Sequence, residues 1–391
     1  MLARARNGWN KTSSSTASSA AACAHPPSVS SRTHHHMAAS ALPTFLRQTR
    51  IDLHNKFIDL EWQQRNRLLQ GTQHPLDPSD PLPQFARLND DAVKERNRYL
   101  NVEPYAQNRI KLKVAEGVSD YINASPIRLG KRRYISTQGP KDTSVNHFYR
   151  MVVGELQSPA VVVMLTQTHE AGREKCFQYY PLNEEQKTLV IPPDAQYDDG
   201  FQGEVDLVDI QHDAQTRTDI RTMKVKTSTN DDGSREMEVK HLLFSGWPDF
   251  LVPEGEERRA LVQLIRLSAR LNRKASTDTD ATANGTSFAE DLIQTDQDNP
   301  RIVHCSAGVG RSGTFIALDY LLSLLLTGQL DNVGPEDDPI LDTVDQLRQQ
   351  RMMMVQSEAQ FMFLYDVMRE QFLARQQQTN GHDTVGGAVQ A

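Results

Sequence analysis

The sequence predicts a single α/β domain, and three stretches support this prediction. Residues 160–165 form a continuous apolar run with three valines in succession, the pattern of a strand that is buried on both faces. Residues 256–271 repeat apolar side chains at the spacing of an amphipathic helix. Residues 302–315 run from apolar residues through closely spaced glycines into apolar residues again, which indicates strand, loop and helix in succession.

The other elements follow in chain order. We expect a helix over 53–69, strands over 216–227 and 236–244, a strand over 301–305 and a helix that begins near Ser312. In the first helix, Phe57, Leu60, Trp62 and Leu68 are expected to share one apolar face. Residues 230–233 suit the loop of a hairpin because they combine Asn, Asp and Gly.

Composition and charge exclude several classes of protein. The chain has 391 residues and a net charge of −7, but residues 1–50 contain six basic residues and no acid, which leaves 37 basic against 50 acidic residues in the rest. A body this acidic has no general nucleic-acid footprint. The apolar run 316–326 is shorter than the roughly 18 residues of a membrane span. Three cysteines at unrelated positions build neither a disulfide framework nor a metal site, so we expect a reducing compartment.

Both ends of the chain are expected to be disordered. Residues 1–43 are rich in Ser, Ala and Arg and poor in large apolar side chains, as is typical of a disordered tail. The same composition is found in mitochondrial targeting segments, so that alternative stays open. The folded domain is expected over 44–375, with a polar surface insertion at 272–300, and a second disordered tail over 376–391.

The stretch around Cys305 carries the chemistry. Five residues separate Cys305 from Arg311, so the loop between them has room to curl until its backbone N–H groups face one centre, as in an anion-binding nest: Ser306, Ala307, Gly308, Val309 and Gly310. The N-terminus of the following helix adds to the positive potential. Arg311 offers a planar fork for two oxygens of a phosphate group.

The same environment would activate the sulfur of Cys305. A free thiol has a pKa of about 8.5, and a helix N-terminus with nearby cations lowers that pKa by roughly 1–5 units. We therefore expect a nucleophilic thiolate, with the Ser312 hydroxyl placed to donate to it. The alternative is that Cys305 is one more small buried core residue. We disfavour this alternative because His304, Arg311 and Ser312 accompany the cysteine at the positions that an anion cradle requires.

The stretch 302–315 resembles the signature of the protein tyrosine phosphatases, in the form typical of the phosphotyrosine-specific, non-receptor branch. Further matches occur in the order that this family has, over about residues 45–375: Asn97-Arg98-Tyr99, Asp120–Ser125, Ser136–Pro140, Glu170 to Cys176, Trp247-Pro248-Asp249 and Val355–Phe361. The resemblance implies one domain with a highly twisted mixed β-sheet, helices on both sides, and the phosphate-binding loop between a strand and a helix.

The resemblance also implies roles for individual residues. Cys305 would be the nucleophile, Arg311 and the loop amides would bind the phosphoryl oxygens, and Asp249 would be the general acid and then the general base. Gln356 would orient the hydrolytic water, and Ser312 would hydrogen-bond the sulfur. The substrate would contact Tyr99, Asn101, Phe250 and Gln360 as well as the loop. Glu170 would orient Arg311, Lys175 would lie near the general acid, and Trp247 and His304 would be further supporting residues.

Two positions depart from the family pattern. The family usually has an acid at the position of Asn101, where it grips the backbone of the substrate, so peptide anchoring is expected to be weaker. The family usually has glycine at the position of Leu251, and a leucine would be strained there if the backbone adopts a positive φ.

These observations predict a metal-independent phosphatase, without a cofactor, that hydrolyses phosphotyrosine in signalling proteins through a phosphocysteine. One alternative is a catalytically silent module that binds phosphotyrosine, and another is a sulfur-transfer or acyl enzyme, which would need a base and an oxyanion site instead of this loop. Expected partners are phosphotyrosine-containing proteins, with no nucleic acid and no membrane. The protein is expected to be a monomer in the cytoplasm, with the nucleus as a second location.

Overall fold

The computed structural model describes residues 42–73, 80–230, 233–248, 251–272, 292 and 297–383. Several predictions lie outside these residues: the N-terminal tail up to residue 41, the general acid Asp249 with its neighbour Phe250, most of the insertion, and residues 384–391. In the part of the chain that is described, no helix is long and apolar enough to cross a membrane.

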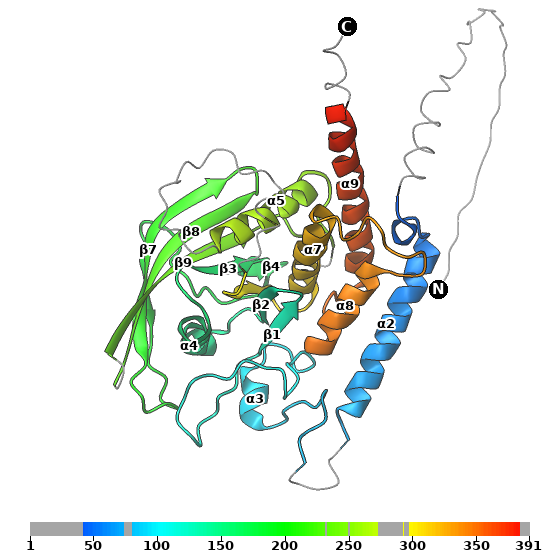
Figure 1. Cartoon of the computed structure of the whole chain (residues 1–391). Coiled ribbons are helices and arrows are strands. Elements are labelled where there is room, and N and C mark those ends of the chain that lie inside the picture. Colours follow the sequence, from blue (N-terminus) through cyan, green and yellow to red (C-terminus); the bar gives the residue numbers. More distant parts are fainter. Residues whose placement is uncertain are drawn as a thin grey trace, which may run out of the picture. The chain divides into compact units, whose positions relative to one another are not determined.

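The fold is built on one mixed sheet of eight strands in the order β1-β2-β10-β3-β9-β8-β7-β6 (Figure 1). The strands are β1 Ala124–Leu129, β2 Arg132–Thr137, β3 Ala160–Met164, β6 Thr188–Ile191, β7 Gln202–Asp213, β8 Thr218–Thr229, β9 Gly233–Phe244 and β10 Arg301–His304. The central strands β2, β10, β3 and β9 are parallel to one another, and the outer pairs are antiparallel. A separate two-stranded hairpin joins β4 His169–Glu170 to β5 Arg173–Glu174.

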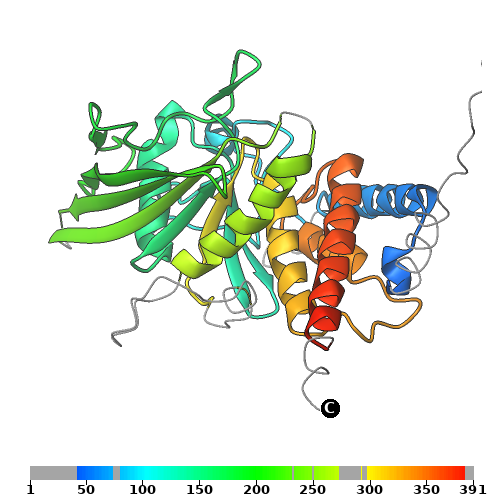
Figure 2. The same cartoon turned by 90° about the horizontal axis from the view of Figure 1, so that it is seen from above.

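Helices cover both faces of this sheet, as Figure 2 shows from above. They are η1 Thr44–Leu46, α2 Arg50–Gln70, α3 Asp91–Arg96, η2 Asp142–Ser144, α4 Val145–Glu155, α5 Gly255–Leu271, α7 Gly310–Leu326, α8 Pro339–Gln350 and α9 Glu358–Asp383. One core packs α4 against one face, and the other core packs α2, α5, α7, α8 and α9 together on the opposite face. The predicted α/β domain with helices on both sides of a mixed sheet is confirmed.

Strand β3 explains why the sequence predicted a doubly buried strand. Val161 and Val163 belong to the core under α5 and α7, and Val162 and Met164 belong to the core under α4. Successive side chains of a strand point to opposite faces, so a strand between two cores must be apolar at every position. In the neighbouring strand β10, Ile302 and Val303 likewise belong to opposite cores, whereas the two terminal residues of the strand, Arg301 and His304, are buried and polar. The loop that begins with Cys305 follows this strand.

The first long helix is confirmed, but one residue of its predicted apolar face is wrong. Helix α2 begins at Arg50, after the N-cap Thr49, whose side chain accepts from the Asp52 backbone while the Asp52 carboxylate accepts from the Thr49 backbone. Its buried side chains include Leu53, Phe57 and Leu60. Trp62 is 57% exposed, since at 100° per residue it lies on the side away from these three.

The predicted boundaries of the insertion and of the C-terminal tail need correction. At the ends of the insertion, Leu292, Gln297 and Asn299 are buried, so these residues are not surface loop. The Asn299 side chain donates to the Gln157 and Pro159 carbonyls, which ties the end of the insertion to the turn before β3. Helix α9 continues to Asp383, so the prediction of disorder from residue 376 is wrong for 376–383.

Candidate active site

The loop between β10 and α7 curls as its glycine at position 308 allows. Gly308 has φ +70, and a Cβ at this position would lie 2.1 Å from the Thr137 carbonyl oxygen. Any other residue would therefore be strained and would also collide with the backbone that follows β2. Gly310, the second glycine of the stretch, is the first residue of α7 and does not have a positive φ.

The carbonyl groups of this loop are held from behind by Arg351, a residue that sequence reasoning missed. The Arg351 guanidinium donates to the carbonyls of Gly308 at 2.8 Å and Ala307 at 3.1 Å, and the Ser136 hydroxyl donates to the Gly308 carbonyl at 3.0 Å. With these carbonyls pulled outward, the N–H groups of the same peptides face inward. Arg351 is fully buried, and burial lowers its pKa to about 10. No local signal in the sequence marks a buried arginine that lies 40 residues beyond the loop.

Arg311 is locked into one orientation by Glu170. Its two terminal nitrogens donate to the two carboxylate oxygens of Glu170 at 2.6 and 2.7 Å, and one of them also donates to the Leu165 carbonyl at 3.0 Å. A bidentate pair of this kind fixes the plane of the guanidinium. The two residues are 141 positions apart, and the structure brings them together at the end of β3 as the sequence predicted.

The thiol of Cys305 lies among groups that stabilise its anion. Burial by itself would raise the pKa of Cys305, but the Ser312 hydroxyl, the Arg311 guanidinium and the backbone N–H groups of Ser312 and Gly308 outweigh burial and leave the pKa below its ordinary value. Among the described residues, the buried Ser312 hydroxyl has no other group to hydrogen-bond. We therefore assign this hydroxyl to the sulfur, whose anion it helps to stabilise.

His304 supports the loop as a neutral side chain. It is fully buried, and burial lowers its pKa to about 4. One ring nitrogen lies 2.6 Å from the Tyr179 hydroxyl, which in turn lies 3.0 Å from a ring nitrogen of His241. The other ring nitrogen of His304 lies 3.2 Å from the Cys305 carbonyl. The imidazole is thus part of the scaffold under the loop and does not face the cavity.

The cavity above Cys305 is walled on one side by Tyr99. The Tyr99 hydroxyl lies 2.8 Å from the Ser306 hydroxyl, which donates to the Lys175 carbonyl at 2.9 Å. The cavity has a volume of about 510 Å³. Its lining contains Tyr99, Asn101, Val102, Arg173, Glu174, Lys175, Cys305, Ser306, Ala307, Gly310, Arg311, Gln356, Ser357 and Gln360. Most of the predicted site residues that the structure describes therefore meet in one cavity.

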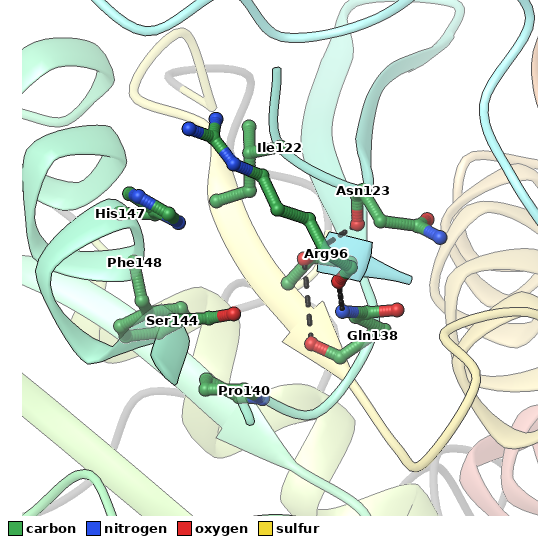
Figure 3. Close-up of a pocket in the computed structure, with 9 residues that line it drawn as sticks. Arg96, Ile122, Asn123, Gln138, Pro140, Ser144, His147 and Phe148 are labelled. Carbon is green, nitrogen blue, oxygen red and sulfur yellow. Dashed lines mark hydrogen bonds between the residues drawn. The ribbon is translucent and has the colours of Figure 1, made fainter. Parts of the chain in front are cut away.

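A second, smaller pocket has Arg96, Gln138 and His147 in its lining (Figure 3). Gln138 donates to the Arg96 carbonyl at 2.8 Å and accepts from the Arg98 backbone N–H at 2.8 Å. Its volume of about 10 Å³ is that of roughly one water molecule. The pocket is too small for a substrate, so we assign Gln138 the task of holding the backbone next to Tyr99.

Gln356 reaches the cavity from a strained turn. Met353 and Val355 both have positive φ, at 59° and 57°, and for a β-branched residue such as Val355 this conformation is rare. The Arg348 guanidinium holds the turn by donating to the carbonyls of Met354 and Val355, at 3.0 Å each. The Gln360 side chain accepts from the Gln356 backbone N–H at 3.0 Å. The structure therefore brings both predicted glutamines to the site, with Gln360 bracing Gln356.

The segment that carries the predicted acid is anchored by Trp247. This side chain is buried, and its indole N–H donates to the Leu251 carbonyl at 3.1 Å across the positions of Asp249 and Phe250. Leu251 is 63% exposed and does not have a positive φ. The condition for strain at Leu251 is therefore not met, because its backbone adopts a conformation open to any residue.

Comparisons with known proteins agree with this geometry. The family model described as protein-tyrosine phosphatase matches residues 93–370. Tyrosine-protein phosphatase 1 of Saccharomyces cerevisiae is 32% identical over 354 residues, which cover 83% of this chain and 96% of that protein. Tyrosine-protein phosphatase 2 of Schizosaccharomyces pombe is 32% identical over 279 residues, and there the chain spans 34% of the relative's length.

Solved structures show the same fold. The catalytic domain of the human protein tyrosine phosphatase non-receptor type 18 superposes with a TM-score of 0.59 at 27% identity, covering 86% of this chain and 99% of that one. A second structure of that protein, in complex with phosphopeptides, has the same score and coverage. Because the family model covers more than half of the chain, and the Saccharomyces cerevisiae relative matches over nearly its whole length, this chain belongs to the protein-tyrosine phosphatase family.

Proposed function

We propose that the protein hydrolyses phosphotyrosine in other proteins through a covalent phosphocysteine. The observation that carries the proposal is the lowered pKa of Cys305 at the centre of a loop whose carbonyls Arg351 holds outward. A thiolate below a ring of N–H donors and beside the fixed Arg311 fork suits attack on a phosphate dianion. Membership of the family supports the same reaction.

The first step transfers the phosphoryl group to sulfur. The Cys305 sulfur forms a bond to phosphorus while the bond between phosphorus and the phenolic oxygen breaks, and Asp249 gives its proton to that oxygen. Arg311 and the loop N–H groups stabilise the three equatorial oxygens. The sulfur keeps the hydrogen bond from Ser312, which also stabilises it when it later leaves.

The second step returns the enzyme to its starting state. Gln356 orients a water molecule, and the Asp249 carboxylate takes a proton from it as the water oxygen bonds to phosphorus. The bond between sulfur and phosphorus breaks, which releases inorganic phosphate and restores the thiolate. The bracing of Gln356 by Gln360, and the turn held by Arg348, support this role.

Selectivity for phosphotyrosine would come from the Tyr99 wall. A phenyl ring is long enough to bring its phosphate to Cys305 while it stacks on Tyr99, whereas the shorter phosphoserine would leave its phosphate above the loop. The structurally similar human phosphatase has been solved with phosphopeptides, which agrees with peptide substrates for this fold. We further propose the cytoplasm as the location, because both described cysteines are free thiols, as is usual in a reducing compartment. We also propose that the enzyme is a monomer and that its substrates are signalling proteins.

A phosphopeptide panel tests the proposal. Phosphotyrosine peptides should be hydrolysed at least 100-fold faster than the same peptides with phosphoserine or phosphothreonine, because the shorter side chains leave their phosphate above the loop. A factor of 100 corresponds to about 2.7 kcal/mol of transition-state binding. Cys305→Ser should abolish release of phosphate, and Asp249→Ala should slow it while phosphopeptide binding remains. Full activity of Cys305→Ser would overturn the mechanism. Binding without turnover by the unmodified protein would favour the catalytically silent module instead.

A further inference from the structure

The guanidinium of Arg173, on the rim of the cavity, has no role in the mechanism proposed above. Arg173 is exposed and lines the cavity together with Glu174. The Glu174 carboxylate accepts from the Arg98 guanidinium at 3.0 Å, so its charge is compensated. For Arg173 the described part of the chain provides no ion pair. Its charge is therefore left to act on whatever enters the cavity.

The hairpin β4–β5 directs Arg173 toward the reacting centre. Ala171 and Gly172 both have positive φ, at 49° and 73°, so the two-residue turn between the strands is of the type that keeps a hairpin tight. The turn places Arg173 directly opposite Glu170. Residues directly opposite one another in an antiparallel pair present their side chains on the same face, with Cβ atoms about 5 Å apart. Because Glu170 grips Arg311, Arg173 emerges on the face that looks toward the active site.

The described lining of the cavity has no uncompensated carboxylate that could pair with Arg173. Glu174 is the one acidic residue among the described residues of the lining, and Arg98 neutralises it. Asn101, at the position where the family usually has an acid, lines the cavity as a neutral amide. The rim therefore offers no carboxylate to the backbone of a bound peptide and a positive charge to its side chains.

We propose that Arg173 determines specificity by binding an acidic side chain that flanks phosphotyrosine in the substrate. This inference rests on the proposed function and names the class of peptide that the site takes. An aspartate or glutamate near phosphotyrosine would pair with the Arg173 guanidinium while the phosphate occupies the loop. At an exposed site such a pair is worth about twofold to fivefold in affinity, and salt weakens it.

The experiment compares two phosphotyrosine peptides that differ only in charge. One carries Asp on both sides of phosphotyrosine, and the other carries Asn at the same positions. We expect the ratio of kcat/KM for the acidic to the neutral peptide to be about fivefold at low salt and to fall toward one in 0.5 M salt. The ratio should fall to about one in Arg173→Gln and below one in Arg173→Glu. Because each ratio is measured within one enzyme, a change in overall activity does not affect it.

Arg235 supplies the matched control. It is an exposed arginine at the far end of β9, about 30 Å along the strand from the segment that carries Trp247. Arg235→Glu makes the same change in net charge, and we expect it to leave the ratio as in the unmodified enzyme. Equal ratios for unmodified enzyme, Arg173→Gln and Arg173→Glu would overturn the inference, as would an equal effect of Arg235→Glu.

Binding separates this inference from the proposed function. In the Cys305→Ser background, the dissociation constants of the two peptides report recognition without turnover, and their ratio should also depend on Arg173. Hydrolysis of both peptides at the same rate would contradict the specificity role of Arg173 but not the proposed function. Absence of hydrolysis by the unmodified enzyme would contradict the proposed function, while the ratio of dissociation constants would still decide the role of Arg173.

Discussion

Two buried cysteines show how the environment of a side chain decides its chemistry. Cys176 and Cys305 are close neighbours, since a Cβ on Gly139 would lie 2.9 Å from the Cys176 Cβ and 2.9 Å from the Cys305 carbonyl oxygen. Burial raises the pKa of Cys176 well above its ordinary value. The hydroxyl, guanidinium and N–H donors around Cys305 reverse that effect and lower its pKa. Of these two thiols, Cys305 should therefore have the larger thiolate fraction at any pH.

Alkylation tests this difference within one molecule. We expect iodoacetate at pH 6.5 to modify Cys305 at least tenfold faster than Cys176, because the thiolate is the reactive form. Mass spectrometry of the two cysteine peptides over time gives both rates. Inorganic phosphate should protect Cys305 by occupying the loop. Equal rates for the two thiols in the folded protein would show that the loop does not activate the sulfur.

Arg351 should matter for catalysis although it does not face the cavity. Replacing it with lysine keeps a charge but removes the planar fork that holds two loop carbonyls. We expect Arg351→Lys to lower kcat/KM for an aryl phosphate by about 10- to 100-fold, since small displacements of catalytic groups have effects of that size. The affinity for inorganic phosphate should fall in parallel. Unchanged phosphate affinity in the folded variant would contradict the role that we assign to Arg351.

Among the elements, the phosphate-binding loop depends most on a single backbone angle. Gly308→Ala introduces a methyl group 2.1 Å from the Thr137 carbonyl oxygen at a φ of +70. Gly117 is the matched control, because its φ is +87 and no atom lies within 4 Å of a Cβ there. We expect Gly117→Ala to cost about 1 kcal/mol of stability and no activity. Gly308→Ala should lose more stability than that and at least 100-fold in kcat/KM.

Thermal unfolding and aryl phosphate hydrolysis check the two glycine variants together. If Gly308→Ala behaves like Gly117→Ala in both measurements, the loop does not need the left-handed conformation at residue 308. A loss of activity with normal stability would still support the account, since the loop would then have moved locally.

Elements with regular periodicity were predictable from the sequence, and the strained turn at residues 353–355 was not. Strand β3 and helix α5 each carry a local pattern, because one residue in two or in three to four points to the same core. Met353 and Val355 have positive φ in a turn that is held by Arg348, which is close in the sequence, and by the Val309 carbonyl, which is far from it. Strain that is imposed by tertiary contacts leaves no mark in the local sequence.

Across the whole molecule, the resemblance to a family predicted which residues meet, and the structure supplied the supports between them. The pairing of Glu170 with Arg311 was implied by the resemblance, whereas the position of Arg351 behind the loop follows only from the packing of distant segments. The exposed Trp62 is a case in which a local sequence pattern led to a wrong prediction. A loose apolar pattern among charges did not reveal which side of α2 faces the core.

The buried histidines should make the whole fold sensitive to acid. Burial lowers the pKa of His304 to about 4, and burial together with Arg96 lowers that of His147 to about 4. The unfolded chain binds protons at these groups near pH 6.5, so the free energy of unfolding should fall as pH drops from 6.5 to 4. Each group contributes about 3 kcal/mol to this loss.

Urea unfolding between pH 7 and pH 4.5 measures this slope. His147→Gln, which removes one of these groups, should reduce the slope by up to one proton. A stability that is constant from pH 7 to pH 4.5 would contradict neutral burial of these side chains.

If Cys305 carries the phosphoryl group during turnover, the phosphocysteine can be trapped and located. Gln356→Ala should slow the second step, so that rapid quenching with a phosphotyrosine peptide leaves one phosphoryl group on the protein, located by mass spectrometry on Cys305. We expect the label on Cys305 to appear in a burst and to disappear as inorganic phosphate is released. Turnover with no label on Cys305, or with the label on another residue, would contradict the phosphocysteine mechanism.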